Sequence, residues 1–467
     1  MDLTTSYWKQ EAHDCQEALL KDLIPLIAIE SVRDDEKASD DAPFGPGPAK
    51  ALHYMLDLAA RDGFETTNVD NAAGAIRFGE GEQILGLLAH LDVVPATGDW
   101  ESPAFSATVR DGRLYGRGTS DDKGPAMACY YALKLLRDAG VKPNCQIHLI
   151  LGTDEESGWE CMDRYFAKMP KPDMAFSPDA DFPIINGEKG IMDLPFTYVN
   201  KDRGYDGTLV EFNAGVRTNI VPEHATAVVS ALGLRRITND WNAFLSRYPG
   251  ISGESDIKNG QITLHCHGAS AHGMEPQEGV NAATHLARFL SAYDLGGANV
   301  FLRFLGQTLH NDFYGNDLGI SSHDDVMGDV SVNPGIARFA HGKGRIVLNI
   351  RYPRSTGQED ILAKLDAVSV GMKRNEPLHA KPVHYVAADD PLVTTLLDVY
   401  RDHTGKPAQE RAIGGITYAH ILDHGVAFGM TMPESDVVIH QPNESLVLSD
   451  LEAGTAIFAD AIYRLCK

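Results

Sequence analysis

Two short apolar runs on either side of a helix-like stretch restrict the fold of this chain more than any other feature. The runs cover residues 84–89 and 147–151, and the stretch 124–139 between them has apolar residues at helical spacing. Strands that are apolar on both faces are typical of parallel sheets covered by helices on both sides. The pattern predicts an α/β domain with a mixed, mostly parallel sheet flanked by helices.

Similar segments occur before and after this core pattern. We expect helices at 7–32 and 49–62 near the N-terminus, because apolar residues recur there at helical spacing. Towards the C-terminus we expect a helix at 391–403, a glycine-rich turn at 413–416 and a strand at 426–430. The chain therefore returns to an α/β pattern at its end.

The middle of the chain has a different sequence pattern, in which short strand-like segments are followed by separate helical segments. The expected elements are strands at 209–212, 225–231 and 262–266, helices at 280–293 and 299–310, and a last exposed strand at 345–352. This change predicts a catalytic domain in two parts, 1–190 and 385–467, interrupted by a large α+β lid domain at 191–384.

The charge balance limits the partners of the protein. There are 65 acidic and 41 basic residues, which gives a net charge of −24. A surplus of this size repels phosphate backbones and anionic membrane surfaces, so we expect no nucleic acid and no membrane as partner. Charged residues at the N-terminus and the lack of about eighteen consecutive apolar residues predict a cytoplasmic protein.

The six cysteines are scattered through the sequence without CxxC spacing. This spacing indicates neither a disulfide framework nor a thiolate zinc site. We therefore expect reduced and mostly buried thiols.

Side chains that suit a metal ion stand at the ends of the predicted strands. His90 and Asp92 end the first apolar strand on the same face, so Asp92 can orient His90 as a ligand. Taken alone, however, this pair favours a solvated loop histidine. In the glycine-rich turn 115–124, Asp121 and Asp122 would repel a phosphate, which leaves a cation site or a simple helix cap.

The second apolar strand is followed by three consecutive acids, Asp154, Glu155 and Glu156. Such acids repel one another unless a cation or a proton intervenes, and the alternative is a solvated acidic turn. Asp179 and His440 lie in turns that need no ligand explanation when each is taken singly.

Five of these segments occur in an order that resembles a known family. HLDVVP, YGRGTSDDKG, GTDEESG, SPDADFP and IHQPNE are similar to the signature set of the zinc aminopeptidase and carboxypeptidase family, which contains aminoacylase, carboxypeptidase G and bacterial dipeptidase V. FGPGPAKAL, NGEKG and the chain length make the dipeptidase V group the nearest likeness, along nearly the whole chain. The resemblance implies a zinc-exopeptidase-like fold and a metallopeptidase activity.

Carried over by position, the resemblance implies two divalent metal ions, with zinc expected and manganese or cobalt also compatible. The implied ligands are His90, Asp121 and Asp179 for one ion, and Asp121, Glu156 and His440 for the other. Asp121 would bridge the two ions, Asp92 would orient His90, and the Asp121–Asp122 peptide bond would be cis. Glu155 falls on the general acid/base that acts on a metal-bridged water.

The resemblance also assigns substrate contacts to the insertion and to one later loop. His272, in GASAHG, would reach the oxyanion, and Arg351 would pair with the C-terminal carboxylate of the substrate, although a strand-surface salt bridge is its alternative. Asn219, Gly414 and Gly415 would line the same pocket. An insertion of this length implies a monomer, since it can replace a lid borrowed from a second subunit.

The predicted function is hydrolysis of dipeptides or short peptides with a free N-terminus. The main alternative is a deacylase of N-acyl or N-succinyl amino acids that uses the same metals. A catalytically inactive binding protein on the same fold would be expected to lack Glu155 or a ligand, and all are present. His265 and His267 flank Cys266, and no role is assigned to them.

Overall fold

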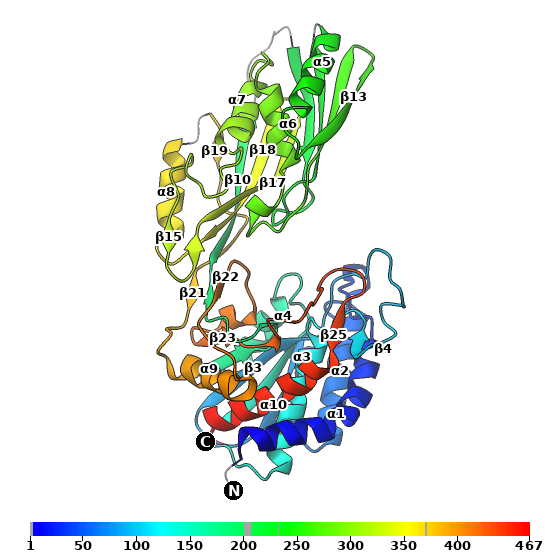
Figure 1. Cartoon of the computed structure of the whole chain (residues 1–467), viewed down its shortest axis with the longest axis vertical. Coiled ribbons are helices and arrows are strands. Elements are labelled where there is room, and N and C mark those ends of the chain that lie inside the picture. Colours follow the sequence, from blue (N-terminus) through cyan, green and yellow to red (C-terminus); the bar gives the residue numbers. More distant parts are fainter. Residues whose placement is uncertain (1–2, 200–206, 232, 369–370) are drawn as a thin grey trace. The chain divides into compact units, whose positions relative to one another are not determined.

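The computed structural model describes residues 3–199, 207–231, 233–368 and 371–467. The chain forms two compact units (Figure 1). Unit 1 comprises residues 1–187, 385–411 and 416–467, and unit 2 comprises 188–384 and 412–415. In the described part of the chain, no helix combines the length and apolar character needed to cross a membrane.

Unit 1 is built on a six-stranded mixed sheet. Its order is β1 (Glu65–Val69), β2 (Ala73–Phe78), β6 (Gln146–Gly152), β3 (Ile84–His90), β7 (Met174–Ser177) and β23 (Gly425–Ala427). The first two pairings are antiparallel, and the other three are parallel. The α/β class with a mixed, mostly parallel sheet is confirmed.

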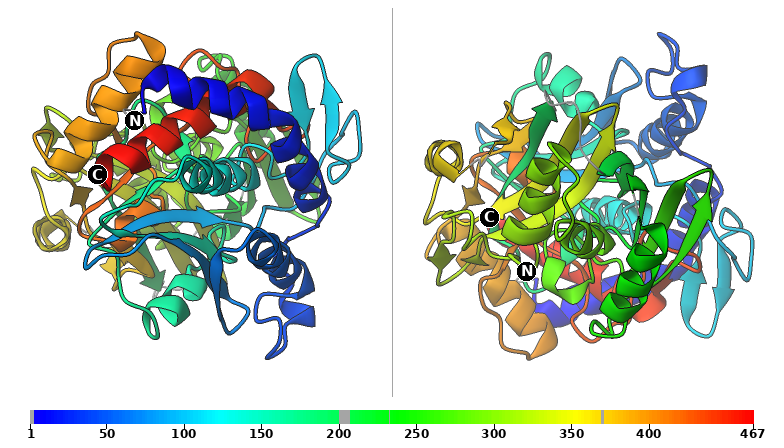
Figure 2. Two further views of the ribbon diagram at one scale, coloured as in Figure 1. Left: turned by 90° about the horizontal axis from the view of Figure 1, so that it is seen from below. Right: turned by 90° about the horizontal axis from the view of Figure 1, so that it is seen from above.

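Helices cover this sheet on both faces (Figure 2). One face carries α1 (Thr5–Ile27), α3 (Lys123–Asp138), α9 (Pro391–Thr404) and α10 (Leu448–Leu465), whereas α4 (Glu160–Phe166) lies on the other. Within β3, Leu87 belongs to the hydrophobic core that includes buried residues of α1, α3, α9 and α10. Leu88 belongs to a separate core that includes buried residues of α4. Burial on both faces explains why β3 is apolar from Ile84 to Ala89.

Helix α2 (Pro46–Arg61) contacts β1 and β2. The remaining elements of unit 1 are a 3₁₀ turn (Asp35–Lys37), β4 (Thr108–Arg110), β5 (Arg113–Tyr115), β8 (Ala180–Asp181), a 3₁₀ turn (Tyr418–Ile421), β24 (Met430–Thr431) and β25 (Ser445–Val447). The strands β9 (Gly187–Glu188), β21 (His384–Tyr385) and β22 (Ala412–Ile413) lie where the chain passes between units.

Unit 2 contains a long antiparallel sheet. Its order is β13 (Ser252–Lys258), β14 (Gln261–His267), β12 (His224–Ala231), β11 (Gly207–Ala214), β17 (Ser331–Ala340), β18 (Lys343–Tyr352), β10 (Gly190–Val199) and β19 (Lys373–Arg374), with β20 (His379–Lys381) also on β10. The other elements are α5 (Leu234–Leu245), α6 (Ala282–Leu290), α7 (Ala298–Arg303), α8 (Gln358–Val368), a 3₁₀ turn (Pro276–Glu278), a π-helical turn (Phe304–Thr308) and the hairpin β15 (His323–Asp324) and β16 (Gly328–Asp329).

Three local predictions were wrong. The strand at 345–352 is not exposed, because β18 lies between β17 and β10 and is buried from Ile346 to Tyr352. The first helix ends at Ile27, and Ile29, which extended the apolar pattern, enters the core from a non-helical segment. The helix expected at 299–310 changes to π-helical geometry at Phe304.

The expectation of reduced cysteines is wrong for one pair. Cys145, just before β6, and Cys466, just after α10, form a disulfide with their Cα atoms 5.5 Å apart. The two residues are 321 positions apart in sequence, so no spacing pattern could reveal that they meet. The other four cysteines are free thiols.

Candidate metal centre

Three loops meet at the carboxyl ends of neighbouring strands in unit 1. His90 is the last residue of β3 and is level with Gly152, the last residue of β6. The acidic turn follows β6, and Asp179 follows β7, which pairs with β3 on its other side. Open α/β sheets bind ligands at this edge, because the loops after parallel strands converge there.

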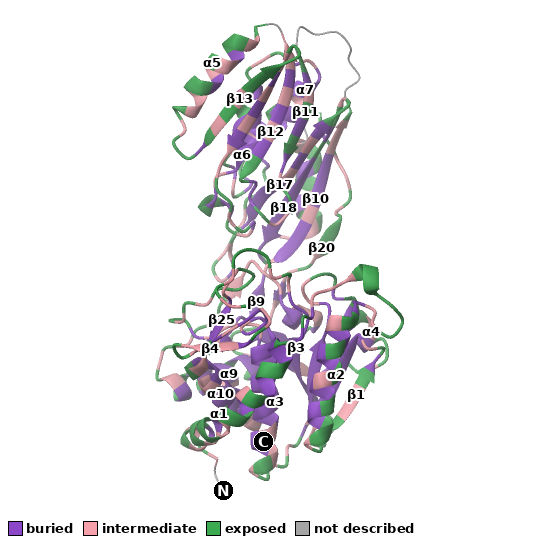
Figure 3. Ribbon diagram, turned by 90° about the vertical axis from the view of Figure 1, so that its right-hand side faces the viewer, coloured by how far each residue is buried: buried purple, intermediate pink, exposed green. Residues whose placement is uncertain are grey.

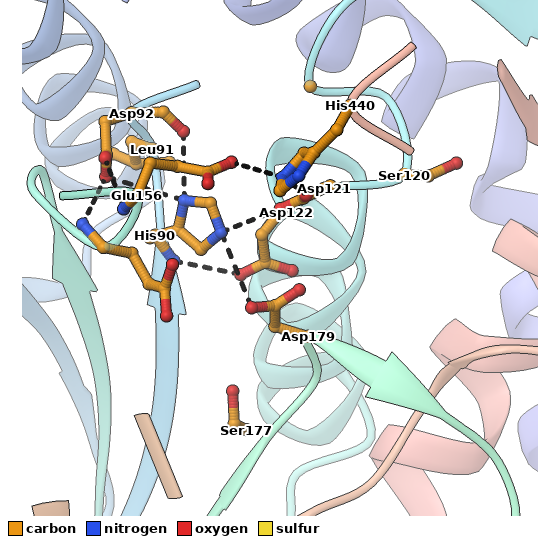
Figure 4. Close-up of polar contacts among 12 residues, drawn as sticks. His90, Leu91, Asp92, Ser120, Asp121, Asp122, Glu156, Ser177, Asp179 and His440 are labelled. Carbon is orange, nitrogen blue, oxygen red and sulfur yellow. Dashed lines mark hydrogen bonds and ion pairs between the residues drawn. The ribbon is translucent and has the colours of Figure 1, made fainter. Parts of the chain in front are cut away.

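Asp121 lies between two histidines from distant parts of the chain (Figure 4). Its Oδ1 atom is 3.0 Å from Nε2 of His90, and its Oδ2 atom is 2.8 Å from Nε2 of His440. The carboxylate therefore presents one oxygen to each imidazole. A carboxylate placed in this way could contribute to two neighbouring metal sites.

Further carboxylates complete two groups of ligand atoms. Asp179 Oδ2 is 3.6 Å from His90 Nε2, and Glu156 Oε1 is 3.0 Å from His440 Nε2. Ligand atoms of His90, Asp121 and Glu156 lie within 4.8 Å of one another, and so do those of His90, Glu155 and Asp179. The other four side chains predicted as ligands thus gather around Asp121, with Glu155 beside His90 and Asp179.

The electrostatics of the cluster favour cations. Burial raises the pKa of Glu155 well above its usual range, and burial together with the charge of Asp121 raises the pKa of Glu156 and Asp179. Burial lowers the pKa of His90, but hydrogen bonds with Asp121 and Asp179 outweigh this and raise it well above 6.5. Acids that are costly to ionise here would be stabilised by divalent ions, so the donor set fits a metal centre.

Asp92 contacts the site in a way that its predicted role did not include. The Nδ1 atom of His90 is 3.0 Å from the backbone carbonyl of Asp92 and 3.5 Å from its carboxylate. That carboxylate accepts hydrogen bonds from the backbone N–H groups of Glu155 (3.0 Å) and Glu156 (3.1 Å). Asp92 therefore fixes the acidic turn as well as the ring of His90.

Asp122 supports the same site through a hydrogen bond with the backbone of His90. The peptide bond between Asp121 and Asp122 is cis, which confirms the geometry that the resemblance implied. The buried Asp122 carboxylate accepts a hydrogen bond from the backbone N–H of His90 at 2.9 Å. Asp122 thus links the loop that carries Asp121 to the end of β3.

Glu444 and Arg117 are supporting residues that sequence reasoning missed. Both side chains are buried, and Arg117 Nη1 donates to Glu444 Oε2 at 2.6 Å. The other oxygen of Glu444 accepts from the backbone N–H groups of Gly118, Ser120 and Asp121. The available signal was Glu444 inside IHQPNE, only four residues after His440.

The predicted substrate contacts belong to unit 2. Arg351 is 5% exposed, and burial lowers its pKa to about 10. Its guanidinium donates to Asn349 Oδ1 (2.9 Å) and to the carbonyl oxygen of Gly414 (2.6 Å). The alternative of a strand-surface salt bridge is therefore not its environment, and Gly414 contacts Arg351 through its backbone carbonyl.

The loops of His272 and Asn219 are adjacent within unit 2. His272 is exposed and pairs with Ile220 through a β-bridge, while Gly273 donates its backbone N–H to Asn219 at 2.7 Å. Gly415 lies next to Gly414 in the short segment 412–415. The roles of these unit 2 residues in substrate binding remain predictions.

Comparison with known proteins places these residues in a family context. The sequence profile of peptidase family M20/M25/M40 matches residues 86–464. A Beta-Ala-Xaa dipeptidase of Lactobacillus delbrueckii subsp. lactis is 42% identical over 471 aligned residues, which cover 100% of this chain and 99% of that protein.

Two solved structures share the fold at low sequence identity. The aminoacylhistidine dipeptidase of Vibrio alginolyticus has a TM-score of 0.57 and 14% identity, covering 96% of this chain and 97% of that one. Human carnosine dipeptidase 1 has a TM-score of 0.56 and 15% identity, covering 100% and 99%.

Proposed function

This chain belongs to peptidase family M20/M25/M40, and from this premise we propose that it is a dinuclear metal-dependent dipeptidase. Its substrates would be dipeptides or short peptides with a free N-terminus. The name of the Lactobacillus relative extends this class to dipeptides that begin with β-alanine. The observation that carries the proposal is the carboxylate of Asp121, which faces His90 with one oxygen and His440 with the other.

The contacts around Asp121 support two proposed ligand sets. His90 and Asp179 share one side of it, and His440 and Glu156 share the other. A mixed set of imidazoles and carboxylates suits zinc, and manganese or cobalt would also fit. When bound, two such ions polarise the scissile carbonyl and lower the pKa of water from 15.7 towards about 7.

Glu155 is proposed to move the proton. Its carboxylate lies within 4.8 Å of ligand atoms of both His90 and Asp179, while its backbone N–H is held by Asp92. Burial raises its pKa, which suits a group that must take a proton and release it again. Glu155 would accept the proton of the attacking water and then deliver it to the leaving amine nitrogen.

We further propose that unit 2 supplies the substrate contacts. Arg351 would pair with the substrate's C-terminal carboxylate, and His272 would stabilise the oxyanion, with Asn219, Gly414 and Gly415 as further contacts. A cytoplasmic monomer of 50.8 kDa completes the proposal, and sedimentation at twice that mass would contradict the monomer.

A substrate panel tests the proposed activity. Ala-Xaa and β-Ala-Xaa dipeptides would be assayed beside N-acetyl and N-succinyl amino acids, at one protein concentration and with the same added metal. The proposal expects cleavage of free-amine dipeptides. Hydrolysis of the acylated amino acids alone would overturn it and identify a deacylase.

A further inference from the structure

A pair of histidines lies on the open face of the unit 2 sheet, in strands that the proposed catalysis does not use. His224 begins β12, and His267 ends β14, where the two residues are directly paired. The residues next to them, Ala225 and Cys266, are buried against α6 and its neighbours. Strand alternation therefore turns both imidazoles towards solvent, and Figure 3 shows this alternation of burial along β12.

The backbone register brings the two rings close together. Gly268 donates its N–H to the carbonyl of Glu223 at 2.8 Å, which marks His224 and His267 as a non-hydrogen-bonded pair. In such pairs the side chains approach most closely. The Nδ1 atoms of the two imidazoles are 3.0 Å apart.

The outer nitrogen of each ring faces a carboxylate. Nε2 of His267 is 3.0 Å from Glu254 Oε2, and Nε2 of His224 is 3.7 Å from Glu223 Oε1. A carboxylate beside one ring nitrogen favours the tautomer with its proton on that nitrogen. With the outer nitrogens protonated, both Nδ1 atoms carry lone pairs that point at each other at 3.0 Å, an arrangement that either a shared proton or a shared metal ion stabilises.

We propose that His224 and His267 form a peripheral site for one divalent transition-metal ion such as Zn²⁺ or Cu²⁺. Imidazole nitrogen suits these ions, and two nitrogens at 2.0–2.1 Å from a tetrahedral Zn²⁺ lie about 3.3 Å apart. The side chains of His224 and His267 are 70% and 39% exposed, so water can complete the coordination shell. Glu254 and Glu223 would hold the rings in the ligating tautomer.

A metal titration of the holoenzyme tests the site. Zn²⁺ would be titrated by calorimetry into protein whose catalytic metals are already bound, and Cu²⁺ would be followed by electron paramagnetic resonance. The proposal expects one additional equivalent, with hyperfine coupling from two imidazole nitrogens on Cu²⁺. His224→Ala and His267→Ala should each abolish this binding.

Matched variants separate this site from nonspecific binding. His265 lies on the same face, but its Nδ1 faces the hydroxyl of Thr226 at 3.4 Å, so His265→Ala should retain the additional ion. Glu254→Gln should weaken binding by about tenfold, because the ring of His267 loses its orienting carboxylate. Dipeptide hydrolysis by the preloaded enzyme should stay unchanged in His224→Ala.

Two results would overturn the proposal. One is the absence of any additional equivalent, with the imidazole pair only exchanging a proton as the pH changes. The other is additional binding that persists in His224→Ala and His267→Ala.

Discussion

Arg117 donates a hydrogen bond to Glu444 at 2.6 Å, and their side chains are 1% and 0% exposed. The same carboxylate accepts the backbone N–H of Asp121 at 3.3 Å. Since Glu444 follows His440 by four residues, this buried ion pair ties the loop of Asp121 to the loop of His440. Glu444, which is not among the proposed metal ligands, thus connects the loop of Asp121 with the loop of His440.

Replacing Glu444 should damage both stability and metal binding. Glu444→Ala leaves Arg117 buried without its partner, which should cost about 3–5 kcal/mol in the free energy of unfolding. Loss of a supporting group should also weaken metal affinity by about tenfold or more. Urea unfolding and metal competition measure the two effects.

The control for Glu444 is an exposed ion pair. Glu101 pairs with Arg110 at 2.8 Å, with side chains 66% and 39% exposed. Glu101→Ala should change the free energy of unfolding by less than about 1 kcal/mol. Equal effects of the two substitutions would contradict a supporting role for Glu444.

Glu155→Gln should separate proton transfer from metal binding. The amide keeps the shape of the side chain but cannot accept a proton, so kcat should fall by about 10²- to 10⁴-fold. Metal content should stay at the wild-type level, because Glu155 is not among the proposed ligands. Glu160→Gln, an exposed substitution in the first residue of α4, where the side chain pairs with Arg164, should leave kcat unchanged. Full activity of Glu155→Gln would refute the proposed proton transfer.

The stability of unit 2 should fall as the solution is acidified. Burial, together with the charge of His285, lowers the pKa of His310 to about 3, and burial lowers the pKa of His285. Between the unfolded pKa of about 6.5 and the folded value, the unfolded state binds more protons. The stabilising contribution is therefore complete above about pH 6.5 and is lost as the pH falls towards 3.

Hydrogen exchange in α6 measures this effect locally, because it resolves one unit from the other. Wild-type protection should decrease from pH 7 to pH 4 after correction for intrinsic exchange rates. His310→Gln should show a shallower decrease, since one of the groups that resist protonation is gone. The same pH dependence in both proteins would rule out His310 as a source of the loss of stability at low pH.

The disulfide between Cys145 and Cys466 should stabilise unit 1. It attaches the end of α10 to the start of β6, and typical disulfides contribute about 2–4 kcal/mol. Cys145→Ser should lower the free energy of unfolding by this amount, whereas Cys15→Ser, at a free thiol, should not. Peptide mapping without reductant should find the linked pair, and its absence in protein purified without reductant would contradict the assignment.

The local patterns of the sequence were sufficient for part of the sheet of unit 1, whereas β1, β2 and β7 were not predicted. Apolar runs identified β3 and β6, and the acids after β6 identified a cation-compatible turn. His440 and Asp121 are 319 positions apart in the sequence, and only the family resemblance suggested that they lie close together. The interior position of β18 was missed because its partners β17 and β10 are set by tertiary structure.

The role of Glu444 was missed for a related reason. A glutamate in a polar loop is usually solvated, and its burial against Arg117 depends on how two distant loops fold together. The pairing of Cys145 with Cys466 has the same origin, since each cysteine is unremarkable in its own segment.

Metal analysis coupled to dipeptide hydrolysis tests the central claim most directly. It is best done with His224→Ala, so that the proposed peripheral ion does not contribute. The account predicts two divalent ions per chain, loss of hydrolysis when a chelator removes them, recovery when metal is restored, and loss of both ions and activity in Asp121→Asn. Undiminished dipeptide hydrolysis by metal-free protein, or full metal content in Asp121→Asn, would contradict it.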